Sequence, residues 1–265
     1  EKEIRHRHSV IQLTSHNVAS FFMEQRMTLE TENLNIHHAW NSNAQDKKFV
    51  ASYSGGKDST LALYQAMQMG EAIGLMVMLE ENGQKSRSHG MSLEIIHAQA
   101  EAIGLPILTA SATWQSYEAQ FIQLLEQQKA LGAEVLVTGD IDLLGHAEWN
   151  QSVCDKSQLQ LCMPLWQKPR LEIIHELINL GFHSVIVTVN LNLGMKAEDL
   201  GRVLTSEYVD ELCARGIDPC GEAGEFHTTV IDGPIFKTPL SMCKGDILYH
   251  ENYAFLPLTL EHHAI

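Results

Sequence analysis

Residues 49–60 read Phe-Val-Ala-Ser-Tyr-Ser-Gly-Gly-Lys-Asp-Ser-Thr. A short apolar run ends here in a glycine-containing turn, and the apolar spacing of an amphipathic helix begins directly after it. This order predicts a strand, an anion-binding loop and the N-terminus of a helix. Glycine permits positive φ and a close approach of the backbone to a bound group. Because the first N–H groups of a helix lack partners and carry the positive end of its dipole, the segment predicts a phosphate site.

Four side chains of this turn suit the same chemistry. Lys57 supplies a mobile positive charge, and Ser54 and Ser59 supply hydroxyl donors. Asp58 is a candidate ligand of Mg²⁺. The spacing is too short for the Gly-x-x-x-x-Gly-Lys-Ser/Thr P-loop. An ordinary β-to-α turn is the alternative, but the complete hexapeptide directly after a strand favours nucleotide binding.

The hexapeptide resembles the PP-loop of the ATP pyrophosphatases, which cleave ATP between the α and β phosphates and transfer AMP to a substrate. The resemblance implies that the nucleotide is ATP and that Mg²⁺ accompanies it. It also implies that the β and γ phosphates, or released pyrophosphate, bind to Ser54, Gly55, Gly56, Lys57, Asp58 and Ser59.

Bulk composition limits the class of protein. The chain has 265 residues, of which 45% are hydrophobic, as in an ordinary globular protein. No apolar run approaches the roughly 18 residues of a membrane span, and the N-terminus lacks the pattern of a signal peptide. The five cysteines include no Cys-x-x-Cys pair, which argues against a disulfide framework or a zinc ribbon. We therefore expect a cytoplasmic protein with reduced thiols and no membrane partner.

The net charge of -15 comes from 33 acidic and 18 basic residues. A surface this acidic repels nucleic acid, and no cluster of Lys or Arg is visible, so we expect no nucleic-acid partner. A magnesium-bound nucleotide is compatible with this charge, because the loop supplies its own positive field.

Residues 1–47 are polar and show no sustained period, and we interpret them as an N-terminal extension, flexible or loosely packed. From residue 49 onward, strand-like and helix-like patterns alternate. Strands are expected at 72–80, 106–110 and 134–138, and helices over 91–103 and 117–131. Such alternation predicts a doubly wound parallel sheet, residues 48–165, with ligands at the carboxyl ends of its strands. Gly139 and Asp140 fall at one such end.

The pattern changes after residue 165. A helix near 171–180, a strand at 184–189 and a helical region at 206–214 precede short β-like pieces separated by Gly and Pro. We interpret residues 166–258 as a second, smaller α+β domain that binds the substrate.

Residues 217–229, Ile-Asp-Pro-Cys-Gly-Glu-Ala-Gly-Glu-Phe-His-Thr-Thr, hold two glutamates three positions apart, each beside a glycine. Glycine lets Glu222 and Glu225 face a polar ligand or an amine, although a surface loop with solvated acids is the alternative. The run 221–228 resembles the Gly-Glu-x-Gly-Glu-aromatic-x-Thr signature of the diphthine–ammonia ligase family. Further stretches that resemble this family, in the same order, are His89-Gly90, 98–106, 138–141, Val153-Cys154, 164–166 and 233–236.

This resemblance spans about residues 49 to 237 and implies the fold of the PP-loop ATP pyrophosphatases with a smaller C-terminal α+β domain. It implies an ATP-dependent adenylating ligase. A carboxylate attacks the α phosphorus, pyrophosphate leaves, and ammonia displaces AMP from the acyl-adenylate to form an amide. The implied partners are ammonia and a small-molecule or protein-borne carboxylate, and a homodimer is compatible with the sequence. In eukaryotes and archaea the family's substrate is diphthine.

One stretch departs from the family. Where members with the diphthine role carry a basic Tyr-Gln-Arg-x-Arg-like stretch, residues 144–150 read Leu-Gly-His-Ala-Glu-Trp-Asn. This version is similar to the bacterial branch of the family and offers no arginine to hold an anionic group. We therefore expect the ATP half of the reaction to carry over, and the acyl substrate stays open.

The resemblance also implies roles for single residues. Lys57, Glu222 and Glu225 are the expected catalytic residues. Asp58 and Asp140 are candidate magnesium ligands, each with helix capping as the alternative. ATP is also expected to contact Gly139, Asp140 and Met78, although Met78 could instead belong to the core. The residues expected to bind the substrate are His89, Glu222, Glu225 and His227.

Two other functions compete with the ligase. A thiolation-type tRNA-modifying enzyme would use cysteines such as Cys154, Cys162 and Cys220, but no pair has persulfide or iron–sulfur spacing, and buried small hydrophobes are the favoured interpretation. A non-catalytic nucleotide-binding module would have no use for Glu222 and Glu225.

Overall fold

A computed structural model describes residues 40–86 and 90–261 of the chain. The described residues belong to one compact unit, which begins at Trp40. The predicted substrate residue His89 and all but the last eight positions of the predicted extension lie outside the described residues.

The expected parallel sheet is confirmed. All of its five strands are parallel, and their order is β3-β2-β1-β4-β5. The chain order reverses between β1 and β4, which is where doubly wound sheets bind ligands. The strands are β1 (Lys48–Ser52), β2 (Glu71–Leu79), β3 (Ile107–Ser111), β4 (Val135–Val137) and β5 (Gln160–Cys162).

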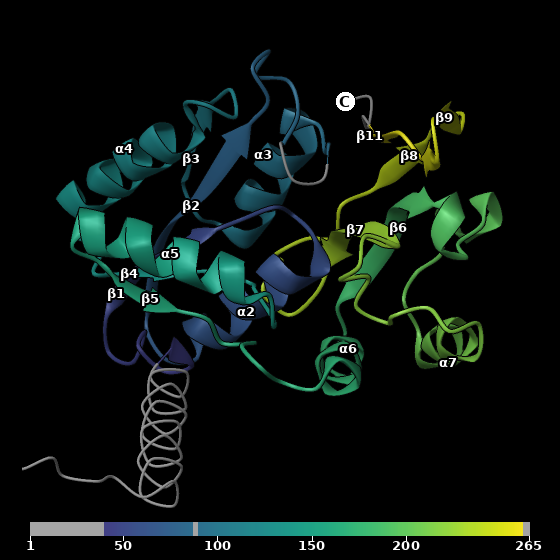
Figure 1. Ribbon diagram of the computed structural model, residues 1–265, viewed down its shortest axis with the longest axis horizontal. Helices are drawn as coiled ribbons and strands as arrows, with labels where there is room; N and C mark the ends of the chain where they lie inside the picture. Colours follow the sequence, from purple (N-terminus) through teal and green to yellow (C-terminus); the bar gives the residue numbers. More distant parts are fainter. Residues whose placement is uncertain (1–39, 87–89, 262–265) are drawn as a thin grey trace, which may run out of the picture. The chain divides into compact units, whose positions relative to one another are not determined.

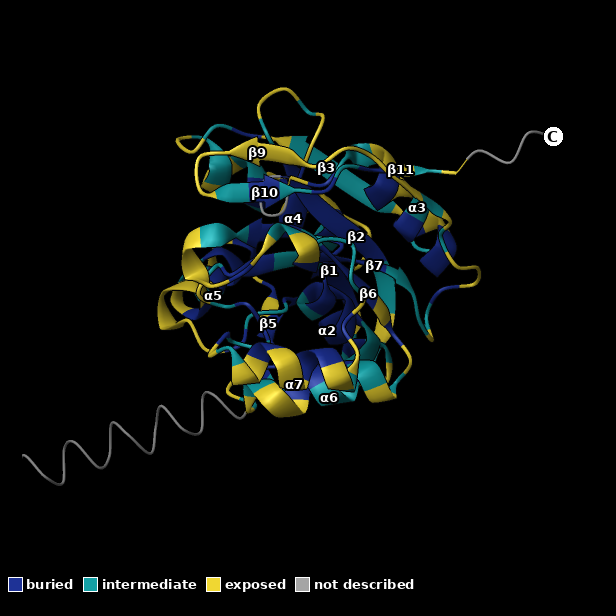
Figure 2. Cartoon of the chain, turned by 90° about the vertical axis from the view of Figure 1, so that its right-hand side faces the viewer, coloured by how far each residue is buried: buried dark blue, intermediate teal, exposed yellow. Residues whose placement is uncertain are grey.

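Helices cover both faces of this sheet (Figure 1), and its central strands β1 and β2 are largely buried (Figure 2). Phe49 and Ala51 of β1 belong to the apolar cluster that includes α2 and α3, whereas Val50 between them belongs to the cluster that includes α4 and α5. This is the period of two that a strand imposes on its side chains. The helices are α2 (Lys57–Met67), α3 (Leu93–Ile103), α4 (Tyr117–Ala130) and α5 (Leu144–Ser157).

The C-terminal part is built on an antiparallel sheet of order β7-β6-β10-β9. Its apolar residues, such as Ile186 and Phe226, join the same cluster as Phe49 and Ala51, so one core runs through both parts. A two-stranded sheet, β11-β8, completes it. The elements are α6 (Arg170–Asn179), β6 (His183–Asn190), α7 (Ser206–Ala214), β7 (Phe226–Asp232), β8 (Met242–Lys244), β9 (Leu248–His250), β10 (Tyr253–Phe255) and β11 (Leu258–Leu260), with 3₁₀ turns at Leu191–Leu193 and Ala197–Asp199.

Residues 40–47, which the sequence interpretation placed in the extension, pack against the first sheet's helices. Trp40 is buried, and its ring meets the ring of Trp166 edge-on at a centroid distance of 5.6 Å. Its indole nitrogen donates to Oε1 of Gln151 at 2.8 Å. Across residues 40–86 and 90–261, no helix is long and apolar enough to cross a membrane.

Candidate active site

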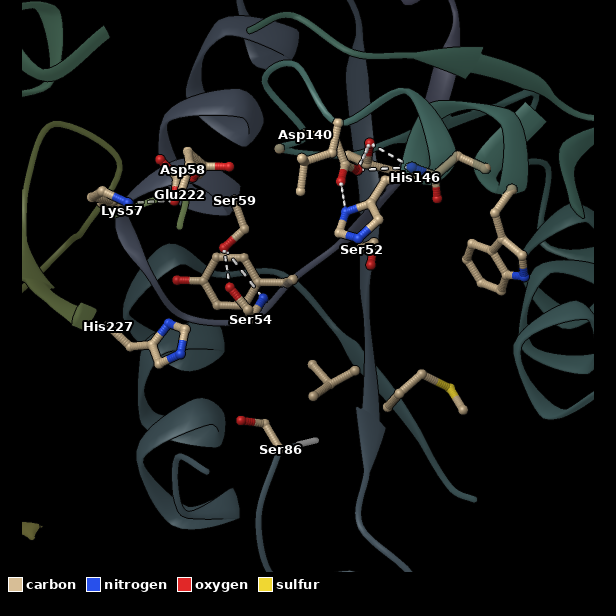
Figure 3. A pocket seen from close by; sticks show the side chains of 18 of the residues that line it. Ser52, Ser54, Lys57, Asp58, Ser59, Ser86, Asp140, His146, Glu222 and His227 are labelled. Carbon is tan, nitrogen blue, oxygen red and sulfur yellow. Dashed lines mark hydrogen bonds and ion pairs between the residues drawn. The ribbon is translucent and has the colours of Figure 1, made fainter. Parts of the chain in front are cut away.

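A pocket of about 740 Å³ opens at the carboxyl ends of β1, β2 and β4 (Figure 3). The turn after β1, the starts of α4 and α5, and the segment from Cys220 into β7 line it. Gly55, Gly56 and Glu225 are not among its lining residues. The expected site residues that do line it are Ser54, Lys57, Asp58, Ser59, Met78, Gly139, Asp140, Glu222 and His227.

The turn after β1 has the geometry expected of an anion-binding loop. Helix α2 begins at Lys57, directly after the glycine pair, and Gly55 has φ +79. The hydroxyls of Ser54 and Ser59 are 2.9 Å apart, and the hydroxyl of Ser59 donates to the carbonyl of Gly56 at 3.2 Å. The N-terminus of α2 therefore faces the pocket with two hydroxyls beside it, an arrangement suited to phosphate. We call residues 54–59 the phosphate loop, after the ligand that the sequence predicts for them.

Lys57 is buried, with 5% of its surface exposed. Its Nζ lies 2.7 Å from Oδ2 of Asp58 and 5.6 Å from the centre of the Phe226 ring. Burial opposes its charge, but the carboxylates of Asp58 and Glu222 help to raise the pKa of Lys57 above its usual value. The side chain is thus a cation held at the floor of the pocket.

Asp140 is held by three side chains. Its Oδ2 accepts from the hydroxyl of Thr138 and from Nδ2 of Asn150, both at 2.7 Å, and its Oδ1 lies 3.0 Å from Nδ1 of His146. Burial opposes ionisation, but these hydrogen bonds hold the pKa of Asp140 below its usual range. The hydrogen bond to Asp140 in turn raises the pKa of His146. Both Asp140 oxygens are therefore already engaged.

The carboxylates of the pocket could hold Mg²⁺ only together with the phosphates of a bound nucleotide. Among the described residues, no group of three or more His, Cys, Asp or Glu could hold a metal ion. Oδ1 of Asp58, however, is buried and has no hydrogen-bond partner within the described chain. Mg²⁺ commonly binds one or two carboxylates and takes its other ligands from phosphate and water. Asp58 fits this role better than Asp140 does.

The two glutamates of the signature have different environments. Glu222 is half-buried and lines the pocket; burial and the charge of Asp58 raise its pKa to about 7. Glu225 is buried, and its Oε2 accepts from the backbone N–H of Ala223 at 3.0 Å. Glu222 is therefore available to a ligand, whereas Glu225 holds the turn in which both occur.

An arginine that the sequence analysis missed anchors this turn. Arg170, at the start of α6, pairs with Asp218 and with both oxygens of Asp142, the latter at 2.9 Å. Asp218 also accepts from the backbone N–H of Glu222 at 3.1 Å. A charged network thus fixes the backbone that carries Glu222, and only the fold brings its members together.

An aromatic wall, also missed, lines the pocket on the α4 and α5 side. It consists of Trp114, Tyr117, Phe121 and Trp149, whose neighbouring ring centroids lie 5.0 to 6.2 Å apart. Trp149 also interacts with Glu118, a carboxylate that pairs with Lys156 at 2.6 Å.

His227 lines the pocket in its neutral form, because burial and the charge of Lys57 lower its pKa to about 4. The three cysteines considered for sulfur transfer are buried. Burial raises the pKa of Cys154 to about 12 and that of Cys162 to about 11, and it also raises the pKa of Cys220. These thiols are therefore protonated at neutral pH, which does not suit a nucleophile.

The chain resembles several known proteins. The structure titled "predicted subunit of tRNA methyltransferase" from Methanocaldococcus jannaschii covers 71% of this chain and 98% of its own, with a TM-score of 0.40 and 15% identity, a likeness too low to support an argument. The curated diphthine–ammonia ligase of Danio rerio is 25% identical over 240 residues, which cover 80% of this chain and 92% of that protein. The Schizosaccharomyces pombe protein of the same name is 25% identical over 229 residues, which cover 77% of this chain but 38% of the yeast protein.

Two family models match consecutive parts of the chain. The diphthamide synthase N-terminal domain matches residues 47–161, which contain the phosphate loop and Asp140. The diphthamide synthase C-terminal domain matches residues 169–262, which contain Glu222 and the antiparallel sheet. The chain therefore belongs to the diphthamide synthase family, the family of the diphthine–ammonia ligases.

Proposed function

We propose that this protein is an ATP-dependent ligase that activates a carboxylate as an acyl-adenylate and converts it to an amide with ammonia. The observation that carries the proposal is that one pocket is lined both by Lys57 with the other side chains of the phosphate loop and by the carboxyl of Glu222, whose pKa is raised to about 7. The names of its family relatives, diphthine–ammonia ligases, support the same reaction class.

In the first step the phosphate loop binds the β and γ phosphates of ATP. The N-terminus of α2, the hydroxyls of Ser54 and Ser59 and the ammonium of Lys57 all favour the charge that builds up on the leaving pyrophosphate. Asp58 would hold Mg²⁺ against the phosphates, and the ion would neutralise part of their charge. The substrate carboxylate attacks the α phosphorus, and the bond between the α phosphorus and the bridging oxygen breaks.

In the second step ammonia attacks the acyl carbon, and AMP leaves with the electrons of the broken C–O bond. Ammonia must be neutral to attack, and the positively charged nitrogen of the adduct must then lose a proton to give the amide. We assign Glu222 as the base that accepts it, because a carboxyl whose pKa lies near 7 is poised to exchange protons at neutral pH. Arg170 and Asp218 hold the backbone of Glu222 in place.

The acyl substrate is a carboxylate, either a small molecule or protein-borne. The family's basic stretch is absent at residues 144–150, and His146 and Trp149 line the pocket instead. Diphthine, the substrate that the relatives are named for, is therefore one candidate among carboxylates rather than the assigned substrate.

The proposal is tested by following the nucleotide products. With the correct carboxylate and ammonia, ATP should yield AMP and pyrophosphate in equal amounts, measured by ion-exchange chromatography of radiolabelled ATP. Exchange of labelled pyrophosphate into ATP, which needs the carboxylate but not ammonia, can be used to screen candidate acids. Turnover that yields only ADP would refute the ligase, and binding of ATP without turnover across the screened acids would favour a nucleotide-binding module.

We assign the adenine ring to the space beside Met78 and Trp149, because the aromatic wall is the pocket's apolar end and a purine stacks well on indole. Trp149→Ala should weaken Mg-ATP binding by about tenfold, since base stacking contributes about 1–3 kcal/mol. Binding of tripolyphosphate, which has no ring, should stay within about twofold of wild type, and Trp149→Phe should retain most of the ATP affinity. Calorimetric titration measures all three. An equal loss for ATP and tripolyphosphate would place the ring elsewhere.

A further inference from the structure

The phosphate loop is held from outside its own sheet. The backbone N–H of Lys57 donates to Oγ1 of Thr228, a residue of β7 in the C-terminal sheet, at 3.1 Å. Thr228 is buried, with 2% of its surface exposed. Gly56, the N-cap of α2, has no side chain that could accept from the unpaired N–H groups of this helix start. The hydroxyl of Thr228, 171 positions away in the sequence, accepts from the first of them.

Strand β7 also fixes the turn through its backbone. The N–H of Val230 donates to the carbonyl of Gly55 at 3.0 Å. Nε2 of the fully buried Gln99 donates to the same carbonyl at 3.0 Å and to the carbonyl of Val230 at 2.7 Å. The fit is tight, since a Cβ on Gly55 would lie 2.4 Å from Oε1 of Gln99.

The same strand leads directly to the second half of the site. Strand β7 begins at Phe226, whose ring lies under Nζ of Lys57, and Glu225 immediately precedes it. The charge of Glu222 acts on Lys57, and the charge of Lys57 acts on Glu222. Strand β7 thus connects the phosphate loop directly to the turn that carries Glu222.

We propose that Thr228 is a positioning residue that holds the phosphate loop in its anion-binding form, so that this loop and the Glu222 turn become ordered together. The inference rests on the proposed function, because it requires phosphate to bind at the loop. It goes beyond that function in making strand β7 of the C-terminal sheet a part of the phosphate site. A separate N-terminal part would then have a phosphate loop without its support.

Two conservative variants test the role of the Thr228 hydroxyl as a hydrogen-bond acceptor. Thr228→Val keeps the shape but removes the acceptor, and we expect it to weaken Mg-ATP and tripolyphosphate binding alike by about tenfold. Thr228→Ser keeps the acceptor and should bind both within about threefold of wild type. Thr205→Val removes the side-chain cap of α7, outside the residues that line the pocket, and controls for general loss of stability. It should lower the melting temperature and leave both affinities unchanged.

The connection to the Glu222 turn is tested by hydrogen exchange on the full chain. Tripolyphosphate should slow amide exchange in peptides covering residues 218–226 of wild type and of Thr228→Ser, and should have little effect there in Thr228→Val at equal occupancy. Wild-type affinity of Thr228→Val, or equal weakening by Thr205→Val, would overturn the inference while the ligase proposal stands. If wild type binds neither ATP nor tripolyphosphate, the proposed function itself fails.

Discussion

Lys57→Ala should slow pyrophosphate release by at least about two orders of magnitude, the size typical for loss of a main contact to developing charge. Lys57 is the one cation within the phosphate loop, and burial keeps its ammonium from being screened by water. The substitution also leaves the carboxylate of Asp58, now 2.7 Å from Nζ, without its partner. We therefore expect the loss to appear in kcat as well as in ATP affinity.

The measurement is the initial rate of pyrophosphate–ATP exchange with the activating carboxylate. Lys57→Arg keeps a charge but not the compact ammonium and should recover only part of the rate. Lys129→Ala, which removes a lysine of α4 bonded to the carbonyl of Ser157, is the control and should retain full exchange. If the exchange rate of Lys57→Ala stays within a few-fold of the wild-type rate, the phosphate loop does not take part in adenylation.

The phosphate loop and the parallel sheet could be predicted because their signals are local. Phe49, Val50 and Ala51 form a strand-like run that ends directly in the glycine turn, and turn chemistry depends on neighbouring residues. Expected and observed strands agree within about two residues for β2, β3 and β4. The division of the sheet into two covered faces follows from the same alternation.

Helix α5 was not predicted, and its buried face explains why. That face includes Asn150 and Ser157 beside Ala147 and Val153, so the apolar period that marks a helix is interrupted. Asn150 is buried because it donates to Asp140, a contact that no sequence spacing reveals. The polar residue that α5 contributes to the site therefore weakens the apolar pattern from which the helix could have been predicted.

The remaining parts of the site depend on contacts between distant segments. Arg170 meets Asp218 across 48 positions, and Thr228 meets Lys57 across 171. A single sequence does not show which residues from distant segments come into contact. The Gly-Glu-x-Gly-Glu signature identified Glu222 and Glu225 as chemically important. It could not show that Glu222 lines the pocket whereas Glu225 holds the turn.

Glu222 should impose a pH step on amide formation. Burial and the charge of Asp58 disfavour the charged form and raise its pKa to about 7. At pH below about 7 the side chain is therefore protonated and cannot accept a proton. The basic form grows as pH rises, and kcat/KM for amide formation should rise through about pH 7 and then level off. Rates must be plotted against free ammonia, because ammonia itself gains its reactive form as pH rises.

Glu222→Gln keeps the size of the side chain and removes the titration. We expect amide formation above pH 7 to fall by about 100-fold or more, the typical contribution of a general base, and the step near pH 7 to disappear. Pyrophosphate–ATP exchange, which precedes the attack of ammonia, should stay within about threefold of wild type. Glu148→Gln, on the exposed side of α5, should behave as wild type in both assays. A pH step that persists in Glu222→Gln would assign the proton transfer to another group, and a collapse of exchange would make Glu222 part of the nucleotide site instead of the base for ammonia.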